Sequence, residues 1–153
     1  MRYIQSLLAM TGIIASAAST TSFPSNFTLI STLDNTALTT DGWGIYDSAA
    51  ETTTTLALSP YTGGTLSWGS KHQALTVVAD ETSIAWIIQI GSEPVAIDTV
   101  TGWELSDDGY LTLNGEQLWA FNESAPAPRR LYWVGAGERE GLVSTQLLVQ
   151  SVV

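Results

Sequence analysis

The sequence contains no cysteine, so neither disulfides nor thiolate metal sites can hold its fold together. It has a single histidine, His72, which excludes a two-histidine metal site and the usual serine or cysteine triads. His72 follows Gly69, Ser70 and Lys71, residues typical of a turn, and we expect it to be exposed there. We therefore predict no metal, no cofactor and a domain stabilised by packing alone.

Basic residues are also scarce, with five Lys or Arg against fifteen Asp or Glu. A chain this acidic repels phosphate backbones and anionic lipid surfaces, so we expect no nucleic-acid partner. Charged residues of either sign make up only 13% of the sequence. Solubility must then depend on Thr, Ser, Asn and Gln, which is typical of a β-protein surface.

No apolar run reaches the roughly 20 residues that a membrane-spanning helix needs. The longest, Ile4 to Ala18, follows a short basic start at Arg2, and Ala15-Ser16-Ala17 has the small-x-small pattern of a signal-peptidase site. We predict a cleaved signal peptide at residues 1–17 and one β domain at 18–153, outside the membrane and either extracellular or in a cell wall. Loss of Arg2 leaves four Lys or Arg against fifteen acids, a net charge of −11.

Short runs of β-branched and aromatic residues recur about every ten residues and are separated by Gly, Asp, Asn and Pro. No window has a persuasive helical stripe. The pattern predicts an all-β antiparallel sandwich or barrel-like domain, and a trefoil-like arrangement stays open. We expect strands at Asn26–Ser31, Thr54–Ser59, Thr65–Trp68, Ala74–Ala79, Ile84–Ile90, Val95–Asp98, Tyr110–Leu113, Gln117–Phe121, Leu131–Val134 and Leu142–Gln150.

The clearest local signal is Asn114-Gly115, a pair that tolerates the positive φ angles of a type I′ hairpin turn. Counting outward from this turn places Leu111 opposite Leu118 on one face of the hairpin. Tyr110 then lies opposite Trp119 on the other face. We expect the leucines to face the core and the aromatic pair to lie nearer solvent.

Strand arrangement can also be predicted for two further segments, one around the Asp107-Asp108-Gly109 turn and one at Ile84 to Ile90. Asp107-Asp108-Gly109 is a turn sequence, so Trp103 to Phe121 is expected to form three consecutive antiparallel strands. Ile84 to Ile90 is apolar on both alternating sets of positions, which indicates a strand buried on both faces.

No catalytic constellation emerges from the acidic residues. Asp107 and Asp108 are adjacent on a turn and diverge, and Glu104 and Glu116 are no better marked as a glycosidase pair. The loop from Gly135 to Gly141 has a superficial likeness to a dinucleotide loop, but its glycine spacing is wrong and no helix follows. We predict no catalytic residue and a plain hairpin loop there.

The chain has a high aromatic load, with six Trp and five Tyr, and aromatic rings stack on sugars as well as filling cores. Trp86 and Trp133 are expected in the core. The candidates for partly exposed, ligand-binding aromatics are Trp43, Tyr46, Trp68, Tyr110 and Trp119.

Two N-glycosylation sequons are present, Asn26-Phe27-Thr28 and Asn122-Glu123-Ser124. The predicted signal peptide would bring both Asn26 and Asn122 into the compartment where they can be modified. The second borders an extended Pro-rich loop and is the better candidate, whereas the first falls at a predicted strand.

Several segments share their order with a known group of proteins: Phe27-Thr28-Leu29-Ile30, Trp103 to Leu113, Leu131-Tyr132-Trp133, and Leu142 to Val149. This order resembles small secreted proteins of filamentous fungi, including the phialide-associated cell-wall protein family. The resemblance implies a secreted, cell-wall-associated protein. Members usually carry cysteines near the end, which this sequence lacks, and no functional residue follows from the resemblance.

Three functions are consistent with the sequence. The leading hypothesis is a non-catalytic secreted or cell-wall-associated domain of structural or interaction type, whose partner is a wall polysaccharide or another extracellular protein. The second is a carbohydrate-binding module that uses exposed aromatics, and the third is a glycoside hydrolase with two carboxylates.

Overall fold

The computed structural model describes residues 21–78, 85–91, 101–134 and 140–153, with only the backbone described at 85–87. The predicted signal peptide, the strand at 95–98, the side chain of Trp86 and most of the 135–141 loop lie outside these residues. The chain is all-β, as predicted, and every strand pairing is antiparallel. The only helical element in the described ranges is a short 3-10 turn, η1, at Thr62–Gly64.

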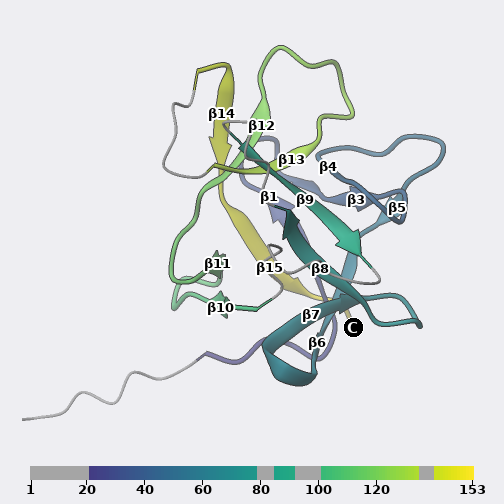
Figure 1. Ribbon diagram of the computed structural model, residues 1–153, viewed down its shortest axis with the longest axis vertical. Coiled ribbons are helices and arrows are strands. Elements are labelled where there is room, and N and C mark those ends of the chain that lie inside the picture. The colour runs from purple at the N-terminus through teal and green to yellow at the C-terminus, as the bar shows by residue number, and fades with distance from the viewer. Residues whose placement is uncertain (1–20, 79–84, 92–100, 135–139) are drawn as a thin grey trace, which may run out of the picture.

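The strands are short and follow one another closely along the chain (Figure 1). Their bounds are β1 Phe27–Ser31, β2 Thr36–Ala37, β3 Thr39–Thr40, β4 Ile45–Tyr46, β5 Thr54–Thr55, β6 Ala57–Tyr61, β7 Thr65–Trp68, β8 Gln73–Val78, β9 Ala85–Gly91, β10 Trp103–Leu105, β11 Leu111–Leu113, β12 Trp119–Asn122, β13 Leu131–Val134, β14 Leu142–Thr145 and β15 Leu147–Ser151.

The main sheet closes on itself. Its order is β14-β12-β13-β9-β8-β7-β6-β1-β15, with β2 also paired to β1. The strands at the two ends of this order, β14 and β15, are consecutive in the chain and separated only by Gln146. One chain segment therefore pairs with β12 along its first half and with β1 along its second, which gives a barrel-like closure.

The change of partner occurs at a corner around Gln146. The hydroxyls of Ser31 and Thr145 are hydrogen-bonded at 2.9 Å in the interior. The Thr32 amide donates to the Gln146 carbonyl at 3.0 Å, and the Gln146 amide donates to the Thr32 hydroxyl at 3.1 Å. The single strand predicted for Leu142–Gln150 is therefore two strands, because these bonds turn the chain from one partner to the next.

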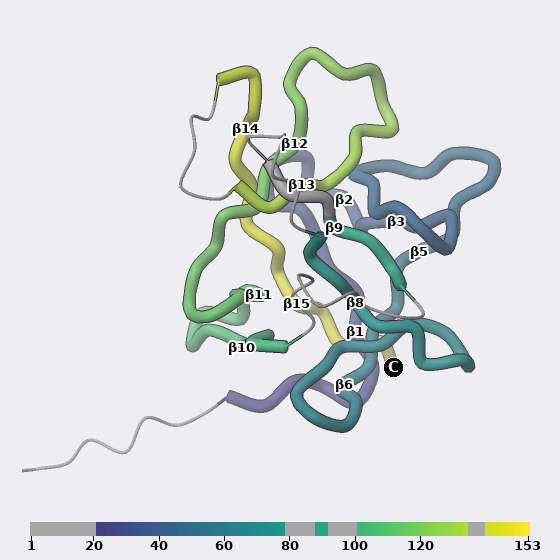
Figure 2. The backbone as a smooth tube through the Cα atoms, viewed as in Figure 1, coloured from purple at the N-terminus to yellow at the C-terminus, as the bar shows by residue number. Residues whose placement is uncertain are grey.

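Two small sheets accompany the barrel (Figure 2). One is the β10–β11 hairpin, with Leu105 opposite Leu111, and the other is β4-β3-β5. In the view of Figure 2 the first lies at the left and the second at the right. The strands β2, β3 and β4 were not predicted, because two residues are too few to produce an alternating pattern.

A cluster of tryptophans fills the core beside the β10–β11 hairpin. Trp119 stacks on Trp103 at 6.0 Å between ring centroids and meets Trp133 edge-on at 4.6 Å. The prediction that Trp133 lies in the core is confirmed. The other large buried side chains are Phe27, Leu29, Leu38, Ile45, Leu56, Leu58, Leu66, Leu75, Val77, Ile88, Ile90, Leu111, Leu113, Phe121, Leu131, Val134 and Leu147.

The turn at Asn114-Gly115 forms as predicted, but the hairpin does not extend beyond it. Both residues have positive φ, 52° and 78°, and Leu113 and Glu116 exchange backbone hydrogen bonds of 2.9 and 3.0 Å. β11 pairs with β10 across the Asp107-Asp108-Gly109 turn, as predicted, but not with the strand that follows it. The next strand, β12, pairs with β13 and β14.

The predicted pairs Leu111–Leu118 and Tyr110–Trp119 are therefore wrong. Leu111 is buried as expected, but Trp119 lies in the core rather than beside solvent. Burial of the large Trp119 indole contributes more free energy of folding than continuation of a local hairpin would. The turn at Asp107-Asp108-Gly109 is confirmed, with the Gly109 amide donating to the Ser106 carbonyl at 2.9 Å.

Candidate functional site

The five candidate aromatic residues differ in exposure. Trp43 is 57% exposed, whereas Tyr46, Trp68 and Tyr110 are half-buried. Trp119 is only 1% exposed and is therefore corrected to a core residue. Tyr110 belongs to the segment between β10 and β11, where it bridges Leu148. The other three aromatics surround one hairpin, formed by β3 and β4.

The tip of this hairpin is built on Asp41. One carboxylate oxygen of Asp41 accepts hydrogen bonds from the amides of Trp43, at 2.9 Å, and Gly44, at 2.8 Å. Gly42 has a φ of +89°, a conformation that favours glycine. The Thr40 hydroxyl closes the turn from the other side by donating to the Gly44 carbonyl at 2.7 Å. The sequence Asp-Gly-Trp-Gly thus forms a tight turn that displays the indole of Trp43.

The barrel fixes the backbone of this turn. The Ile90 amide of β9 donates to the Trp43 carbonyl at 2.8 Å, and Gly44 bridges Gln89 of the same strand. The backbone that carries Trp43 is thus hydrogen-bonded on two sides while its side chain stays in solvent. Such a residue loses little backbone entropy when it binds a ligand.

Tyr46 folds back over the turn. Its hydroxyl donates to the second carboxylate oxygen of Asp41 at 3.1 Å. A Cβ atom built on Gly44 would lie 2.5 Å from the Tyr46 hydroxyl oxygen, so only glycine leaves room for the ring. Burial raises the pKa of Tyr46 above 10.0, as do its hydrogen bond to Asp41 and that residue's charge.

The charge of Asp41 is stabilised by the same contacts. Partial burial raises its pKa, but the amides of Gly44 and Trp43 and the Tyr46 hydroxyl outweigh that effect by hydrogen-bonding to the ionised form. The net result is a pKa below the usual 3.8.

Trp68 of β7 continues this surface. A Cβ atom built on Gly42 would lie 3.7 Å from the Cη2 atom of the Trp68 ring, so the turn rests against the indole. Trp68 also lines a cavity of about 270 Å³ with four other residues, Gly69, Ser70, Lys71 and Gln73. We call Trp43, Tyr46, Trp68 and this cavity the hairpin surface.

A cation lies beside Tyr46. Arg130 bridges Tyr46 through the backbone, just before β13 begins. The guanidinium Nε and Nη2 atoms are shielded from solvent, and neither has a hydrogen-bond partner in the described part of the chain. Its charge is close enough to oppose the rise in the pKa of Tyr46.

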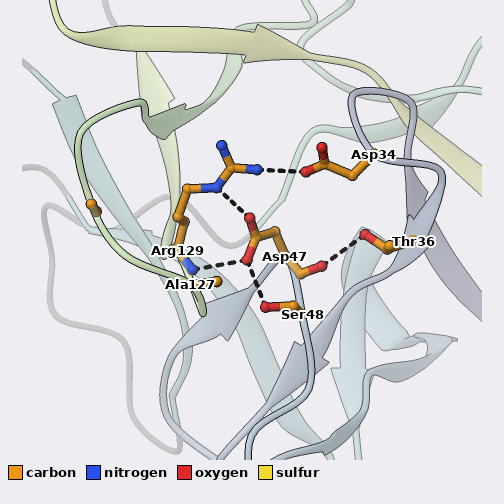
Figure 3. Close-up of a pocket in the computed structure, with 7 residues that line it drawn as sticks. Asp34, Thr36, Asp47, Ser48, Ala127 and Arg129 are labelled. Carbon is orange, nitrogen blue, oxygen red and sulfur yellow. Dashed lines mark hydrogen bonds and ion pairs between the residues drawn. The ribbon is translucent and has the colours of Figure 1, made fainter.

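A second cavity, of about 320 Å³, surrounds Arg129 (Figure 3). The Arg129 Nε contacts Asp47, which is 3% exposed, and Nη2 contacts Asp34 at 2.5 Å. The backbone amide of Arg129 also donates to Asp47, at 2.8 Å. The hydrogen bond to Asp47 raises the pKa of Arg129, and the charges of Asp47 and Asp34 add to the rise.

This arrangement is an ionic clamp between three connecting segments. Asp34 comes from the turn after β1, Asp47 follows β4, and Arg129 precedes β13. As Figure 3 shows, the guanidinium reaches both carboxylates. The sequence alone does not point to these residues, because Arg129 is more than eighty positions away from either acid and each residue is ordinary in its local context.

The remaining candidates lie elsewhere on the surface. His72 is exposed in a turn, as predicted, and stacks on Tyr61 at 4.4 Å between centroids. Asp107 and Asp108 are exposed on their turn. In the residues that the structure describes, no group of three or more potential ligands could hold a metal ion, and no helix is long and apolar enough to span a membrane.

Both sequon asparagines are exposed. Asn26 lies just before β1, and its side-chain oxygen accepts a hydrogen bond from the Ser59 hydroxyl at 2.9 Å. Asn122 is the last residue of β12, and its side-chain oxygen accepts from the Ser124 amide at 2.9 Å. The first sequon asparagine is therefore not buried in a strand.

Comparison of the chain with protein-family models, with curated proteins and with solved structures finds no match.

Proposed function

We propose that this protein is a non-catalytic secreted or cell-wall-associated domain that acts by binding, and that it binds carbohydrate through the hairpin surface. The observation that carries the proposal is the indole of Trp43, more than half exposed on a turn whose backbone is fixed by Asp41 and by Ile90. Full burial of a large apolar side chain is worth about 1.5–3 kcal/mol, so packing alone gives no reason to present it to solvent.

The surroundings of Trp43 suit a sugar ligand. Aromatic rings offer flat apolar faces to the C–H faces of sugar rings, and Trp68 continues this surface beyond Gly42. The cavity beside Trp68 is lined by Ser70, Lys71 and Gln73, whose side chains can hydrogen-bond to hydroxyl groups. Apolar faces with a few polar groups are typical of small-molecule sites.

The Arg129 cavity supports a non-catalytic role. A glycosidase requires free space between two carboxylates for the glycosidic bond and, in inverting enzymes, for a water molecule. Between Asp34 and Asp47 that space is taken by the guanidinium of Arg129, which bonds to both. Hydrolysis therefore ranks third among the candidate functions, after a structural or interaction role and carbohydrate binding.

The test is retention on insoluble polysaccharides by the wild type and Trp43→Ala. We expect wild-type protein to be retained and Trp43→Ala to bind about tenfold more weakly, or about 1.4 kcal/mol. The matched control is Leu33→Ala, which removes an exposed apolar side chain from the turn after β1 and should leave retention unchanged. Denaturation midpoints of both variants should stay close to wild type.

Three outcomes would contradict the proposal. Release of soluble sugars by the wild type would indicate a hydrolase. Equal retention of wild type and Trp43→Ala would remove the hairpin surface as the site. Fractionation of the producing culture into medium, wall and cells tests the location, and protein confined to the cells would argue against an extracellular role.

A further inference from the structure

The few basic residues of this acidic chain differ in whether they form ion pairs. In the described ranges they are Lys71, Arg129 and Arg130. Arg129 is neutralised by Asp34 and Asp47. The other two have no ion pair within the described residues, and both border the hairpin surface.

Of Lys71 and Arg130, Arg130 gives the stronger indication of a ligand. A guanidinium keeps its charge at all ordinary pH values and offers five N–H donors, none of which can become an acceptor. Shielding two of its nitrogens from water without an acceptor is unfavourable for folding. Tyr46 donates to Asp41, whose oxygens also accept from the amides of Trp43 and Gly44. Among the described residues, no carboxylate is paired with Arg130.

The contacts run continuously from Lys71 to Arg130. Lys71 and Trp68 line the same cavity, and Trp68 meets the turn at Gly42. Tyr46 packs on the same turn at Gly44 and pairs with Arg130 through the backbone. A cation thus stands at each end of the aromatic residues.

We propose that the carbohydrate bound at the hairpin surface is acidic, and that Arg130 and Lys71 bind carboxylates of its sugar units. This rests on the proposed function and names the ligand class for the same surface. The charge of Arg130 is permanent and two of its donors have no acceptor among the described residues, whereas Lys71 acts as a point charge, so Arg130 is the main selective residue.

The acidic character of the whole protein does not oppose such a ligand at short range. At physiological ionic strength the screening length is about 8 Å, so distant carboxylates act weakly on a ligand at this surface. Contacts with Arg130 and Lys71 are made within hydrogen-bond distance, where screening is small. We expect binding to require moderate salt and to fall at very low salt, where long-range repulsion returns.

The test uses two polymers with one backbone, polygalacturonate and its fully methyl-esterified, neutral form, with the full mature chain. We expect polygalacturonate to bind about tenfold more tightly than the ester. Arg130→Met should remove most of this preference, whereas Leu33→Ala, in the turn after β1, should leave it unchanged. Lys71→Met should reduce the preference by a smaller factor.

Stability provides a second measurement that separates recognition from folding. Met matches the length of the Arg130 stem but carries no charge, so Arg130→Met should unfold at the same or a higher denaturant concentration than wild type. A clearly lower midpoint would show that Arg130 is needed for folding and would overturn the assignment. Unchanged preference in a stable Arg130→Met variant would overturn it too, because the guanidinium would then take no part in recognising the carboxylate.

The outcomes distinguish this inference from the function on which it depends. Trp43-dependent binding of neutral polysaccharide without preference for the acidic form would overturn the inference and leave the proposed function intact. Binding to neither form nor to any other polysaccharide would remove both. Binding to polyglutamate as tight as to polygalacturonate would show that carboxylates are recognised without a sugar, and would overturn the saccharide class.

Discussion

The indole Nε1 of Trp119 donates a hydrogen bond to the backbone carbonyl of Leu111 at 2.9 Å, in the interior of the protein. The bond links β12 of the main sheet to β11 of the small hairpin. Because Trp119 also stacks on Trp103 of β10, one side chain joins the hairpin to the barrel through both its polar and its apolar parts. Trp119 is therefore a core residue, whereas Tyr110, next to Leu111 in the chain, is half-buried.

Replacing Trp119 by Ala should cost about 3–5 kcal/mol of unfolding free energy, because it leaves a large cavity and an unpaired carbonyl at Leu111. Tyr110→Ala, at a half-buried position one residue away from Leu111, should cost clearly less. Urea denaturation of both variants measures the difference. Equal losses would mean that Tyr110 carries as much of the packing as Trp119.

The stability of the ionic clamp should depend more on the buried pair of Arg129 and Asp47 than on the exposed Asp34. Asp47 is buried, so Arg129→Met leaves an uncompensated interior charge and should cost about 3–5 kcal/mol. The side chain of Asp34 is 44% exposed, and Asp34→Asn should cost about 0–1 kcal/mol. Chemical denaturation checks both values, and the double variant Arg129→Met with Asp47→Leu should recover part of the loss. A large effect of Asp34→Asn would contradict this division.

The turn that carries Trp43 should depend on pH through Asp41. Its pKa in the folded protein is below the usual 3.8, so its contribution to stability is present above pH 3.8 and is lost as pH falls through the lower folded value. We expect backbone amide signals of Trp43 and Gly44 in NMR spectra to shift in that acidic range. Asp41→Asn keeps a side-chain oxygen acceptor but cannot titrate, so the shift should be absent. A shift that persists in Asp41→Asn would assign it to another group.

Gly44 should tolerate no side chain. Ala at this position would place its Cβ 2.5 Å from the Tyr46 hydroxyl oxygen and force the ring away from Asp41. We expect a loss of about 1–3 kcal/mol and weaker polysaccharide binding. Gly91→Ala is the matched control, because its Cβ would make an ordinary contact of 3.4 Å with Thr76 and its backbone needs no positive φ. Equal effects of the two substitutions would show that the space beside Tyr46 is not limiting.

We expect the proposed secreted form to carry N-linked glycan at both sequons, since Asn26 and Asn122 are both exposed. Thr28→Val and Ser124→Ala each remove one acceptor site without touching its asparagine. Intact-mass measurement after expression in a glycosylating host should show the loss of one glycan in each variant. An unmodified wild type would contradict the prediction.

The sequence reveals the local geometry well. Strands Thr65–Trp68 and Leu131–Val134 agree with the predicted bounds to the residue, and both turns, at Asp108-Gly109 and Asn114-Gly115, form as expected. Each of these features depends on residues within a few positions of one another, through side-chain alternation or through the φ angles that Gly and Asn allow.

Only part of the candidate site could be predicted from the sequence. Trp43, Tyr46 and Trp68 could be named as aromatics near glycines, but nothing local shows that Trp68 lies against the turn of Trp43. Arg130 gave no signal at all, because a guanidinium without an acceptor is recognisable only when its surroundings are known.

The sequence by itself determined the fold class, the principal turns and most of the strands, since those follow from backbone preferences and alternation. Only the tertiary structure decided that β12 pairs with β13 and β14 rather than with β11, that Trp119 is core, and that Arg129 joins Asp34 to Asp47. Pairings between distant segments are set by the sum of many burials and hydrogen bonds over the whole barrel. No short window of sequence contains that sum.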